Sequence, residues 1–229
     1  MMLETQGLTL HFRGSQTLHG INFAAKTGGM TCILGPNGVD KTSFLKALAG
    51  THPRSGGTIT LNGESLGRLR AQDIARRGLS VVPQDRMIFP LLTLRENLQT
   101  AFAVLPKSEQ QIPDEIFTLS SILKDFLQRR EGDISGGQLQ QLSIARALIM
   151  KPEVLLLDEP TERIQPKIIQ QIGKVIGYLK GKATWPSCWW SSISNLPTGW
   201  PTNNMSCGAG RCRCQGQRRV LTSWTCATR

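Results

Sequence analysis

Short, mostly apolar runs alternate with segments of helical spacing along most of this chain. Two of the runs, residues 30–34 and 154–157, have the length and composition of buried strands. The predicted strands span residues 8–12, 21–23, 30–34, 57–63, 79–82 and 154–157, and the predicted helices span residues 43–48, 93–103, 113–127, 137–150 and 166–179. Strands that alternate with helices predict an α/β fold around a mainly parallel sheet.

No apolar run approaches the length of a membrane span. The longest runs, such as Val154–Leu157, are far shorter than the roughly 20 residues that a spanning helix needs. The first residues, Met1-Met2-Leu3-Glu4, do not form a secretory signal. We therefore expect a cytosolic protein that reaches a membrane only through a partner.

The positive charge of the chain is concentrated in its last third. The net charge of +11 by itself suggests nucleic-acid binding. Through Glu162, however, the chain has 17 Lys and Arg against 16 Asp and Glu, whereas residues 163–229 include 10 basic residues and no acidic residue. The same segment holds all five Trp and five of the six Cys residues. We infer that the two regions were not shaped by the same constraints.

A glycine-rich run follows the predicted strand 30–34 and opens the predicted helix 43–48. It fits the phosphate-loop pattern G-x-x-x-x-G-K-[ST] except at one position, and it consists of Gly35, Pro36, Asn37, Gly38, Val39, Asp40, Lys41 and Thr42. In such a loop, backbone N–H groups cradle phosphates, the lysine reaches the β- and γ-phosphates, and the hydroxyl binds Mg²⁺. The alternative is a plain connection between a strand and a helix.

Two further motifs are ambiguous when each is taken alone. Asp158 and Glu159 follow a buried strand, where one carboxylate can hold Mg²⁺ through water and the next can act as a general base. They are equally compatible with an ordinary acidic loop. The run Ser135-Gly136-Gly137-Gln138 opens the predicted helix 137–150, and free N–H groups at a helix N-terminus attract anions. The alternative is that Ser135 is a simple N-cap.

In the order and spacing of its motifs, the chain resembles the ATP-binding cassette (ABC) ATPases. The order is the phosphate loop, Gln84 after a strand, the Ser-Gly-Gly-Gln run, and the apolar strand with Asp158 and Glu159. The resemblance covers residues 1–182. It implies a P-loop NTPase domain with a mainly parallel core sheet, antiparallel strands near the N-terminus and a helical subdomain at about residues 85–150.

The resemblance also implies the cofactors ATP and Mg²⁺ and a role for each motif. Glu159 would be the catalytic base and Lys41 the phosphate clamp, assisted by Gln84. The metal ligands would be Thr42, Gln84 and Asp158. Nucleotide contacts would come from the whole phosphate loop and the next residue, Ser43. Phe12 matches the aromatic that stacks on adenine, although an aromatic at a strand end is as often only packing.

The partners follow from the resemblance as well. In this family two ATPase domains sandwich two nucleotides, so Ser135, Gly136, Gly137 and Gln138 would complete the site of a second subunit. Gln84 would also lie near the coupling helix of a transmembrane permease subunit. The implied location is the cytoplasmic face of the inner (plasma) membrane, with a solute-binding protein as an indirect partner and no nucleic acid.

The run that begins at Asp158 and Glu159 favours particular solutes. The run 158–166 looks like the second ATPase subunit of urea importers, a group beside the branched-chain amino acid importers. Arg163 replaces a Gly that is common in this group. The resemblance therefore implies ATP-driven import of urea or branched-chain amino acids.

Asp40 departs from the phosphate-loop pattern, which has Gly at this position. One like-charge contact near 4 Å costs about 4 kcal/mol at an effective dielectric of roughly 20, which weakens binding almost a thousandfold. A Cβ is also added where the backbone must approach phosphate closely. We therefore predict that the chain binds ATP poorly. The Asp and Gly codons differ by one base.

The tail departs from the family more completely. The segment Trp185–Ser192 shows no buried-strand pattern, and no His follows His52. Reading the codons of this segment one base earlier gives apolar residues followed by Val-Glu-Gln, the missing strand and switch sequence. We infer that residues 183–229 are translated out of frame and form a disordered, basic tail. A metal site at Cys207, Cys212 and Cys214 is disfavoured because their spacing fits no common zinc pattern.

Two other functions remain open on the sequence. Asp40 and the lost strand favour an inactive, truncated subunit that keeps the fold, such as a pseudogene product. A non-transport ATPase acting on nucleic acid or ribosomes is the other alternative. Repair ATPases of this family have a long coiled coil between the phosphate loop and Ser-Gly-Gly-Gln, and this chain has no heptads there. Translation-type members carry two such domains in one chain.

Overall fold

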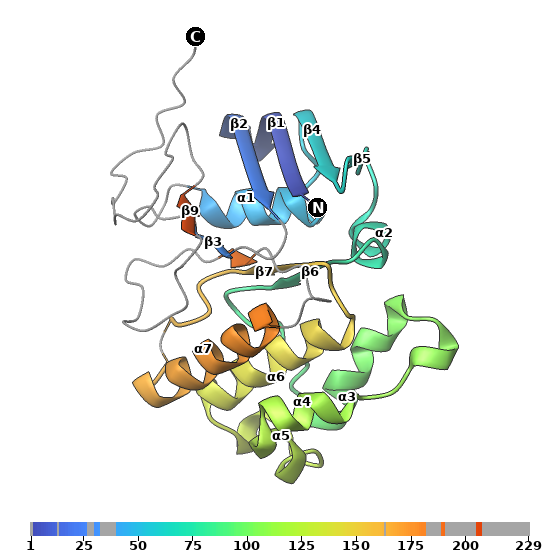
Figure 1. Cartoon of the computed structure of the whole chain (residues 1–229), viewed down its shortest axis with the longest axis vertical. Helices are drawn as coiled ribbons and strands as arrows, with labels where there is room; N and C mark the ends of the chain where they lie inside the picture. Colours follow the sequence, from blue (N-terminus) through green and yellow to red (C-terminus); the bar gives the residue numbers. More distant parts are fainter. Residues whose placement is uncertain are drawn as a thin grey trace.

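The computed structural model describes residues 2–12, 14–26, 30–32, 40–162, 164–181, 189–190 and 205–207 (Figure 1). The strands are β1 (Met2–Phe12), β2 (Ser15–Lys26), β3 (Met30–Cys32), β4 (Gly56–Leu61), β5 (Glu64–Ser65), β6 (Leu79–Val82), β7 (Val154–Leu157), β8 (Trp189–Trp190) and β9 (Met205–Cys207). The α-helices are α1 (Lys41–Leu48), α2 (Ala71–Arg76), α3 (Leu94–Gln99), α4 (Asp114–Leu119), α5 (Ser121–Asp125), α6 (Gly136–Ile149) and α7 (Pro166–Gly181). Short 3₁₀ helices are η1 (Thr100–Val104), η2 (Lys107–Glu109) and η3 (Glu131–Asp133).

The N-terminal strands form an antiparallel sheet in the order β2-β1-β4-β5. The predicted strand 57–63 ends at Leu61, because Asn62 and Gly63 have positive φ angles of 55° and 80° and form the two-residue hairpin turn to β5. Gly57 is required by close packing, since an added Cβ would lie 2.4 Å from the carbonyl oxygen of Gly7. The predicted antiparallel N-terminal strands are thus confirmed.

The second sheet has the order β6-β7-β8-β3-β9, and its strand pairs are parallel. β6 and β7 pair in register from Leu79 opposite Val154 to Val82 opposite Leu157. The predicted parallel core is therefore confirmed, and the predicted strands 79–82 and 154–157 lie side by side in it.

Residues 185–192 show no buried-strand pattern in the sequence, but the structure has a two-residue strand among them. Trp189 and Trp190 form β8, which pairs with β7 and also with Met30 of β3. Two neighbouring strands offer backbone N–H and C=O groups to any extended segment between them, so this pairing does not need an apolar sequence pattern. The other predictions for the tail fall on residues 183–188, 191–204 and 208–229, which lie outside the described residues, together with Cys212 and Cys214.

Helices α3–α7 lie on one side of the parallel sheet, and α1 and the antiparallel sheet lie on the other (Figure 1). The predicted helix 93–103 is α3 followed by η1, and the predicted helix 113–127 is broken into α4 and α5. The break occurs at Ser120, which leaves the helical region and donates its hydroxyl to Gln141 of α6 at 2.7 Å. The helical subdomain is confirmed, but tertiary contacts shorten its helices.

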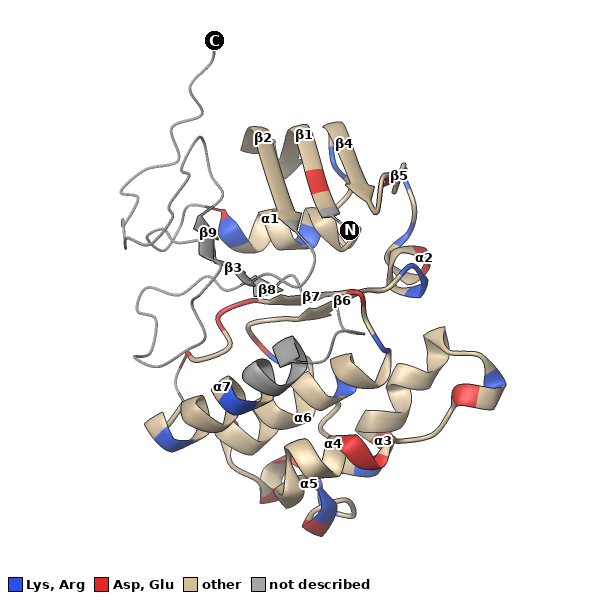
Figure 2. Cartoon of the chain, viewed as in Figure 1, with Lys and Arg blue, Asp and Glu red and all other residues tan. Residues whose placement is uncertain are grey.

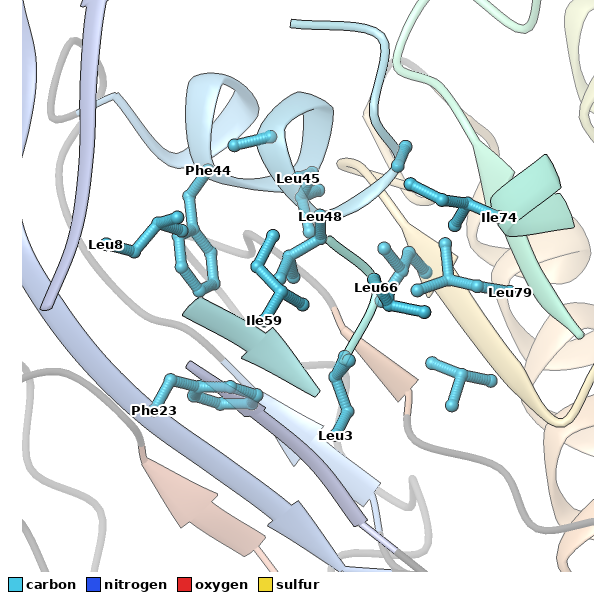
Figure 3. Packing of buried hydrophobic residues seen from close by; sticks show 14 of the residues in the cluster. Leu3, Leu8, Phe23, Phe44, Leu45, Leu48, Ile59, Leu66, Ile74 and Leu79 are labelled. Atoms are coloured by element: carbon cyan, nitrogen blue, oxygen red, sulfur yellow. The ribbon is translucent and has the colours of Figure 1, made fainter. Parts of the chain in front are cut away.

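Two hydrophobic clusters fill the space on either side of the parallel sheet. One joins the antiparallel sheet, α1 and α2 to the sheet (Figure 3), and the other joins α3–α7 to it. β7 contributes to both, because Val154 and Leu156 belong to the first cluster and Leu155 and Leu157 to the second. All four side chains are buried, as expected for a strand covered on both faces.

Phe44 is the largest side chain fully buried in the first cluster, where its ring meets that of Phe23 edge-on at 5.8 Å (Figure 3). Replacing it with Ala should lower the free energy of unfolding by about 3–5 kcal/mol, because a buried ring is lost and a cavity remains. Urea denaturation measures this loss. Leu91→Ala is the matched control, since Leu91 is 80% exposed, and it should change stability by less than about 0.5 kcal/mol. Equal losses in the two variants would contradict this packing.

Charges of both signs occur over the described part of the chain. Acidic and basic residues are interspersed on α2 and α5, acidic residues lie on α4, and lysines lie on α7 (Figure 2). Among the described residues, no helix has the length and apolar character that crossing a membrane requires.

Candidate active site

The candidate residues gather at the carboxyl ends of β6 and β7. The ladder continues one step past these strands, because the N–H of Asp158 donates to the carbonyl of Val82 at 2.9 Å. Gln84 lies two residues beyond Val82, so it leaves the sheet beside Asp158 and Glu159. Ligand sites in open α/β sheets lie at this edge, beyond the carboxyl ends of the strands.

Asp158 lies in this site with one carboxylate oxygen unsatisfied. The side chain is 3% exposed, and its Oδ1 atom has no hydrogen-bond partner among the described residues. Burial raises the pKa of this carboxyl above its ordinary value, with the Glu159 charge adding to the effect. A hydrogen bond with the Thr42 hydroxyl and the charges of Lys46 and Lys41 oppose the shift. Asp158 therefore joins the sheet edge to the start of α1.

Replacing Asp158 with Asn should stabilise the fold near neutral pH by about 1 kcal/mol, because a buried charge with an unsatisfied oxygen is removed. The pKa of Asp158 is raised in the folded state, so its penalty is absent below the unfolded pKa and grows as pH rises through the folded pKa. The difference in Tm between the two proteins should follow the same course. An Asn variant that is less stable than the parent at pH 7 would rule this out.

Lys41 is the first residue of α1 and is only 6% exposed. Burial lowers the pKa of its ammonium group, and the nearby charges of Glu159 and Asp158 partly oppose this shift. The structure thus brings the predicted phosphate clamp next to both acidic residues, as the shared site requires. These two carboxylates partly offset the cost of burying the ammonium group.

Gln84 is hydrogen-bonded to two carboxylates. Its Nε2 atom donates to Oε2 of Glu162 at 2.6 Å and to Oε2 of Glu159 at 3.4 Å. Glu159 has a φ angle of +46°, a strained value for a residue with a side chain. Such outliers concentrate at functional sites, and here the strain accompanies a carboxylate turned towards Gln84.

Asp40 has a left-handed backbone conformation, which Gly adopts most easily, and Gly is the residue that the phosphate-loop pattern has at this position. Its φ and ψ angles are 57° and 26°, and its carbonyl accepts the N–H of Phe44 at 3.0 Å. The Oδ1 atom accepts the hydroxyl of Ser43 at 3.3 Å, which holds the carboxylate over the first turn of α1. If this segment is a phosphate loop as predicted, this carboxylate would lie where a phosphate approaches. Residues 35–39, the rest of the predicted loop, lie outside the described residues.

The Ser-Gly-Gly-Gln run forms a capping box at the start of α6. Ser135 Oγ accepts the N–H of Gln138 at 3.4 Å, and Gln138 Oε1 accepts the N–H of Ser135 at 2.7 Å. Ser135 is therefore an N-cap of α6, as the alternative interpretation predicts. Gly137 packs tightly, since an added Cβ would lie 2.8 Å from Ile168 of α7. The first-turn N–H groups of Gly136 and Gly137 have no acceptor within the helix. Binding to a partner's nucleotide stays a prediction.

Phe12 is at the end of β1 and is 41% exposed, as a base-stacking residue would be. Its ring stacks on His52, with the centroids 4.6 Å apart and the planes at 20°. Burial, together with the charge of Lys46, lowers the pKa of His52 and favours the neutral ring. An adenine would need the other face of Phe12.

Sequence reasoning missed the side chains that hold the loop after Gln84. Arg146 donates to the carbonyls of Met87 and Arg86 at 2.8 and 2.9 Å, and the fully buried Asn97 accepts the N–H of Phe89 at 2.9 Å. It also missed Glu162, which stands in the run after Asp158. The available signal was that Glu162 stands three residues after Glu159, because a tight turn brings side chains three residues apart to the same side of the chain.

The side chains of the site can be compared with the ligands that Mg²⁺ prefers. The described residues contain no group of three or more His, Cys, Asp or Glu side chains arranged to hold a metal. Mg²⁺ commonly binds to one or two protein groups and to substrate phosphates, rather than to an all-protein cage. The unsatisfied Oδ1 of Asp158 and the adjacent Thr42 hydroxyl fit that mode. The site therefore suits a magnesium ion that arrives with a nucleotide.

Residues 18–162 match the sequence model of the family described as ABC transporter. The chain belongs to the ABC transporter family. It is 36% identical over 180 residues to the high-affinity branched-chain amino acid transport ATP-binding protein BraG of Pseudomonas aeruginosa, covering 78% of this chain and 77% of BraG. It is 35% identical over 181 residues to the Fe(3+) ions import ATP-binding protein FbpC of Mesorhizobium japonicum. That match covers 77% of this chain and 49% of FbpC, so the chain spans about half the length of this relative.

Solved ABC cassettes share the fold of this ABC protein. A nucleotide-free cassette superposes with a TM-score of 0.72 at 20% identity, covering 84% of this chain and 81% of that one. A dimeric cassette in a post-hydrolysis state bound to ADP and Pi gives a TM-score of 0.73 at 21% identity, covering 83% and 87%. At these identities the likeness concerns the fold alone.

Proposed function

We propose that this chain is the ATP-binding, ATP-hydrolysing subunit of an ABC importer. One observation carries the proposal: three segments that are far apart in the sequence meet at one edge of the sheet, and they supply Lys41, Thr42, Gln84, Asp158 and Glu159. A connection loop or an acidic loop alone does not require that convergence. The motif order and the family membership support the same conclusion.

Each of these residues has a chemical task in the proposed reaction. Lys41 leaves its carboxylate neighbours to contact the β- and γ-phosphates, and Glu159 accepts the proton of the attacking water. Thr42, Asp158 and Gln84 would hold Mg²⁺, which when bound would neutralise charge on the phosphates. The burial of Lys41 and Asp158 strengthens their electrostatic effect, because the local dielectric is low.

A second copy or a paralogous subunit completes the proposed site. Ser135 and Gln138 bond to each other, so the open N-terminus of α6 is preorganised for an external anion. A helix terminus that serves the γ-phosphate of a partner's nucleotide gives the sandwich dimer of this family. The dimeric fold relative is consistent with such a pairing.

The loop after Gln84 supports docking to a permease. Met87, Phe89 and Leu91 are 57%, 50% and 80% exposed, while Arg146 and Asn97 hold the backbone of the loop from behind. Presenting apolar side chains on a fixed backbone is typical of a protein interface. A transmembrane permease subunit is the proposed partner, which puts this subunit at the cytoplasmic face of the membrane with a solute-binding protein on the far side.

The proposed solute is a branched-chain amino acid or urea. Similarity to BraG over most of both chains supports the amino acids, and the run 158–166 supports urea. The test is uptake of labelled leucine and of labelled urea by cells that lack their own ATPase subunit and express this chain with candidate permeases. Uptake of neither solute by this chain or by its Asp40→Gly variant would contradict the assignment.

An inactive subunit is a second candidate, and Asp40 is the observation that favours it. Its carboxylate, held by Ser43 over the start of α1, is placed to repel a polyanion. Calorimetric titration with ATP and Mg²⁺ separates the two candidates. Binding and hydrolysis by the unmodified chain support the active subunit, whereas activity only after Asp40→Gly supports the inactive one.

A further inference from the structure

Glu162 makes a short hydrogen bond to one of the proposed catalytic groups, although no motif assigns it a role. The Nε2 atom of Gln84 lies 2.6 Å from Oε2 of Glu162 and 3.4 Å from Oε2 of Glu159. We propose that Glu162 is a positioning residue that orients the carboxamide of Gln84 for Mg²⁺. The inference rests on the proposed function, in which Gln84 is a ligand of that ion.

The chemistry of the two groups fixes the direction of the carboxamide. An ionised carboxylate can only accept hydrogen bonds, so it must face the NH₂ group of Gln84 and not its oxygen. Oε1 of Gln84, the atom that can bind a hard cation, then points away from Glu162. The two hydrogen bonds of the carboxamide to these carboxylates both use Nε2, so they leave Oε1 to an ion.

The backbone explains why both carboxylates reach the same amide. The N–H of Glu162 donates to the carbonyl of Glu159 at 3.1 Å, which closes a tight turn directly after β7. The positive φ of Glu159 belongs to this turn. Gln84 lies in the loop after the neighbouring strand β6, so its amide bridges the loops that follow two paired strands.

The proposed role is that of an outer partner of a metal ligand. Such partners fix the orientation of the ligand, and their loss typically lowers metal affinity about 10- to 100-fold. Glu162 contributes more to this orientation than Glu159, because its hydrogen bond is shorter. When Glu162 holds the amide, the carboxylate of Glu159 can turn to the attacking water without releasing Gln84.

The test measures magnesium dependence of nucleotide binding rather than turnover. The full chain carrying Asp40→Gly is mixed with trinitrophenyl-ATP, and its fluorescence is followed as Mg²⁺ is added. Glu162→Ala should raise the Mg²⁺ concentration at half-saturation about tenfold, while affinity in EDTA stays at the parent value. Glu162→Gln should restore most of the magnesium response, because its carbonyl can still accept the Gln84 amide. Glu64→Ala is the matched control, since it removes the same charge from a 77% exposed side chain on β5.

The outcomes separate the inference from the proposed function. A magnesium response in the parent that Glu162→Ala leaves unchanged overturns the role of Glu162 but keeps the proposed site. Nucleotide binding that ignores Mg²⁺ in every variant, or no binding at all, overturns both. Equal losses in affinity with EDTA and with Mg²⁺ show a general structural role and also overturn the inference.

Discussion

Replacing Asp40 with Gly should tighten ATP binding by up to about a thousandfold. Removing one like charge near the phosphates regains about 4 kcal/mol at an effective dielectric of roughly 20. The structure adds a second reason, because Asp40 has a φ angle of 57°, which Gly adopts without strain. Calorimetric titration with ATP and Mg²⁺ measures the change. The gain is the largest we expect from any single substitution in this chain.

The Asp40→Asn variant separates the effect of the charge at position 40 on ATP affinity from the effect of the added Cβ. Asn tolerates the left-handed conformation and keeps a Cβ, but it carries no charge. If charge dominates, the Asn variant should regain most of the affinity of the Gly variant. If the Cβ blocks the close approach of a phosphate, Asn should bind as poorly as Asp. Equal affinity in all three proteins would show that position 40 lies away from the nucleotide.

The second large effect is expected for Glu159→Gln in the Asp40→Gly chain. Removing a general base typically costs about 10²–10⁴ in rate, so hydrolysis in a single turnover should fall by that factor. ATP affinity should stay the same, because Gln is nearly the same shape and keeps an oxygen that can accept from Gln84. Rapid-quench measurement of phosphate release, together with calorimetry, separates the two quantities.

Glu64→Gln is the control for this experiment. It makes the same chemical change at an exposed residue of β5, whose only ion pair among the described residues is with Arg77 at 3.4 Å. We expect its hydrolysis rate to match that of the Asp40→Gly parent. A Glu159→Gln variant that hydrolyses ATP as fast as the control would exclude Glu159 as the base.

The parts of the fold that could be predicted are those with strong local signals. β6 and β7 are short apolar runs, and the structure has them with the predicted bounds. α2 was not predicted, because a six-residue helix with one buried side chain, Ile74, leaves little periodicity. The break at Ser120 also has no local signal, since it depends on a contact with Gln141 of another helix.

Some residues of the candidate site could likewise be predicted from the sequence, and others could not. Lys41, Thr42, Asp158 and Glu159 stand in short motifs, and a parallel sheet brings the ends of its strands together, so their meeting could be predicted. The hydrogen bond between Gln84 and Glu162 could not be predicted, since it joins residues 78 positions apart. It depends on the register of β6 with β7 and on the turn at Glu159, neither of which the residue pattern specifies.

The alternation of β7 between two clusters has a consequence for how the protein melts. Val154 and Leu156 form a wall of one cluster, and Leu155 and Leu157 form a wall of the other. If either half opened alone, the face of this four-residue strand that it covers would be exposed to water. We therefore expect the calorimetric and van't Hoff enthalpies of unfolding to agree, as for a single cooperative unit. The strand that leads to Asp158 and Glu159 of the proposed site also makes the two halves of the molecule unfold together.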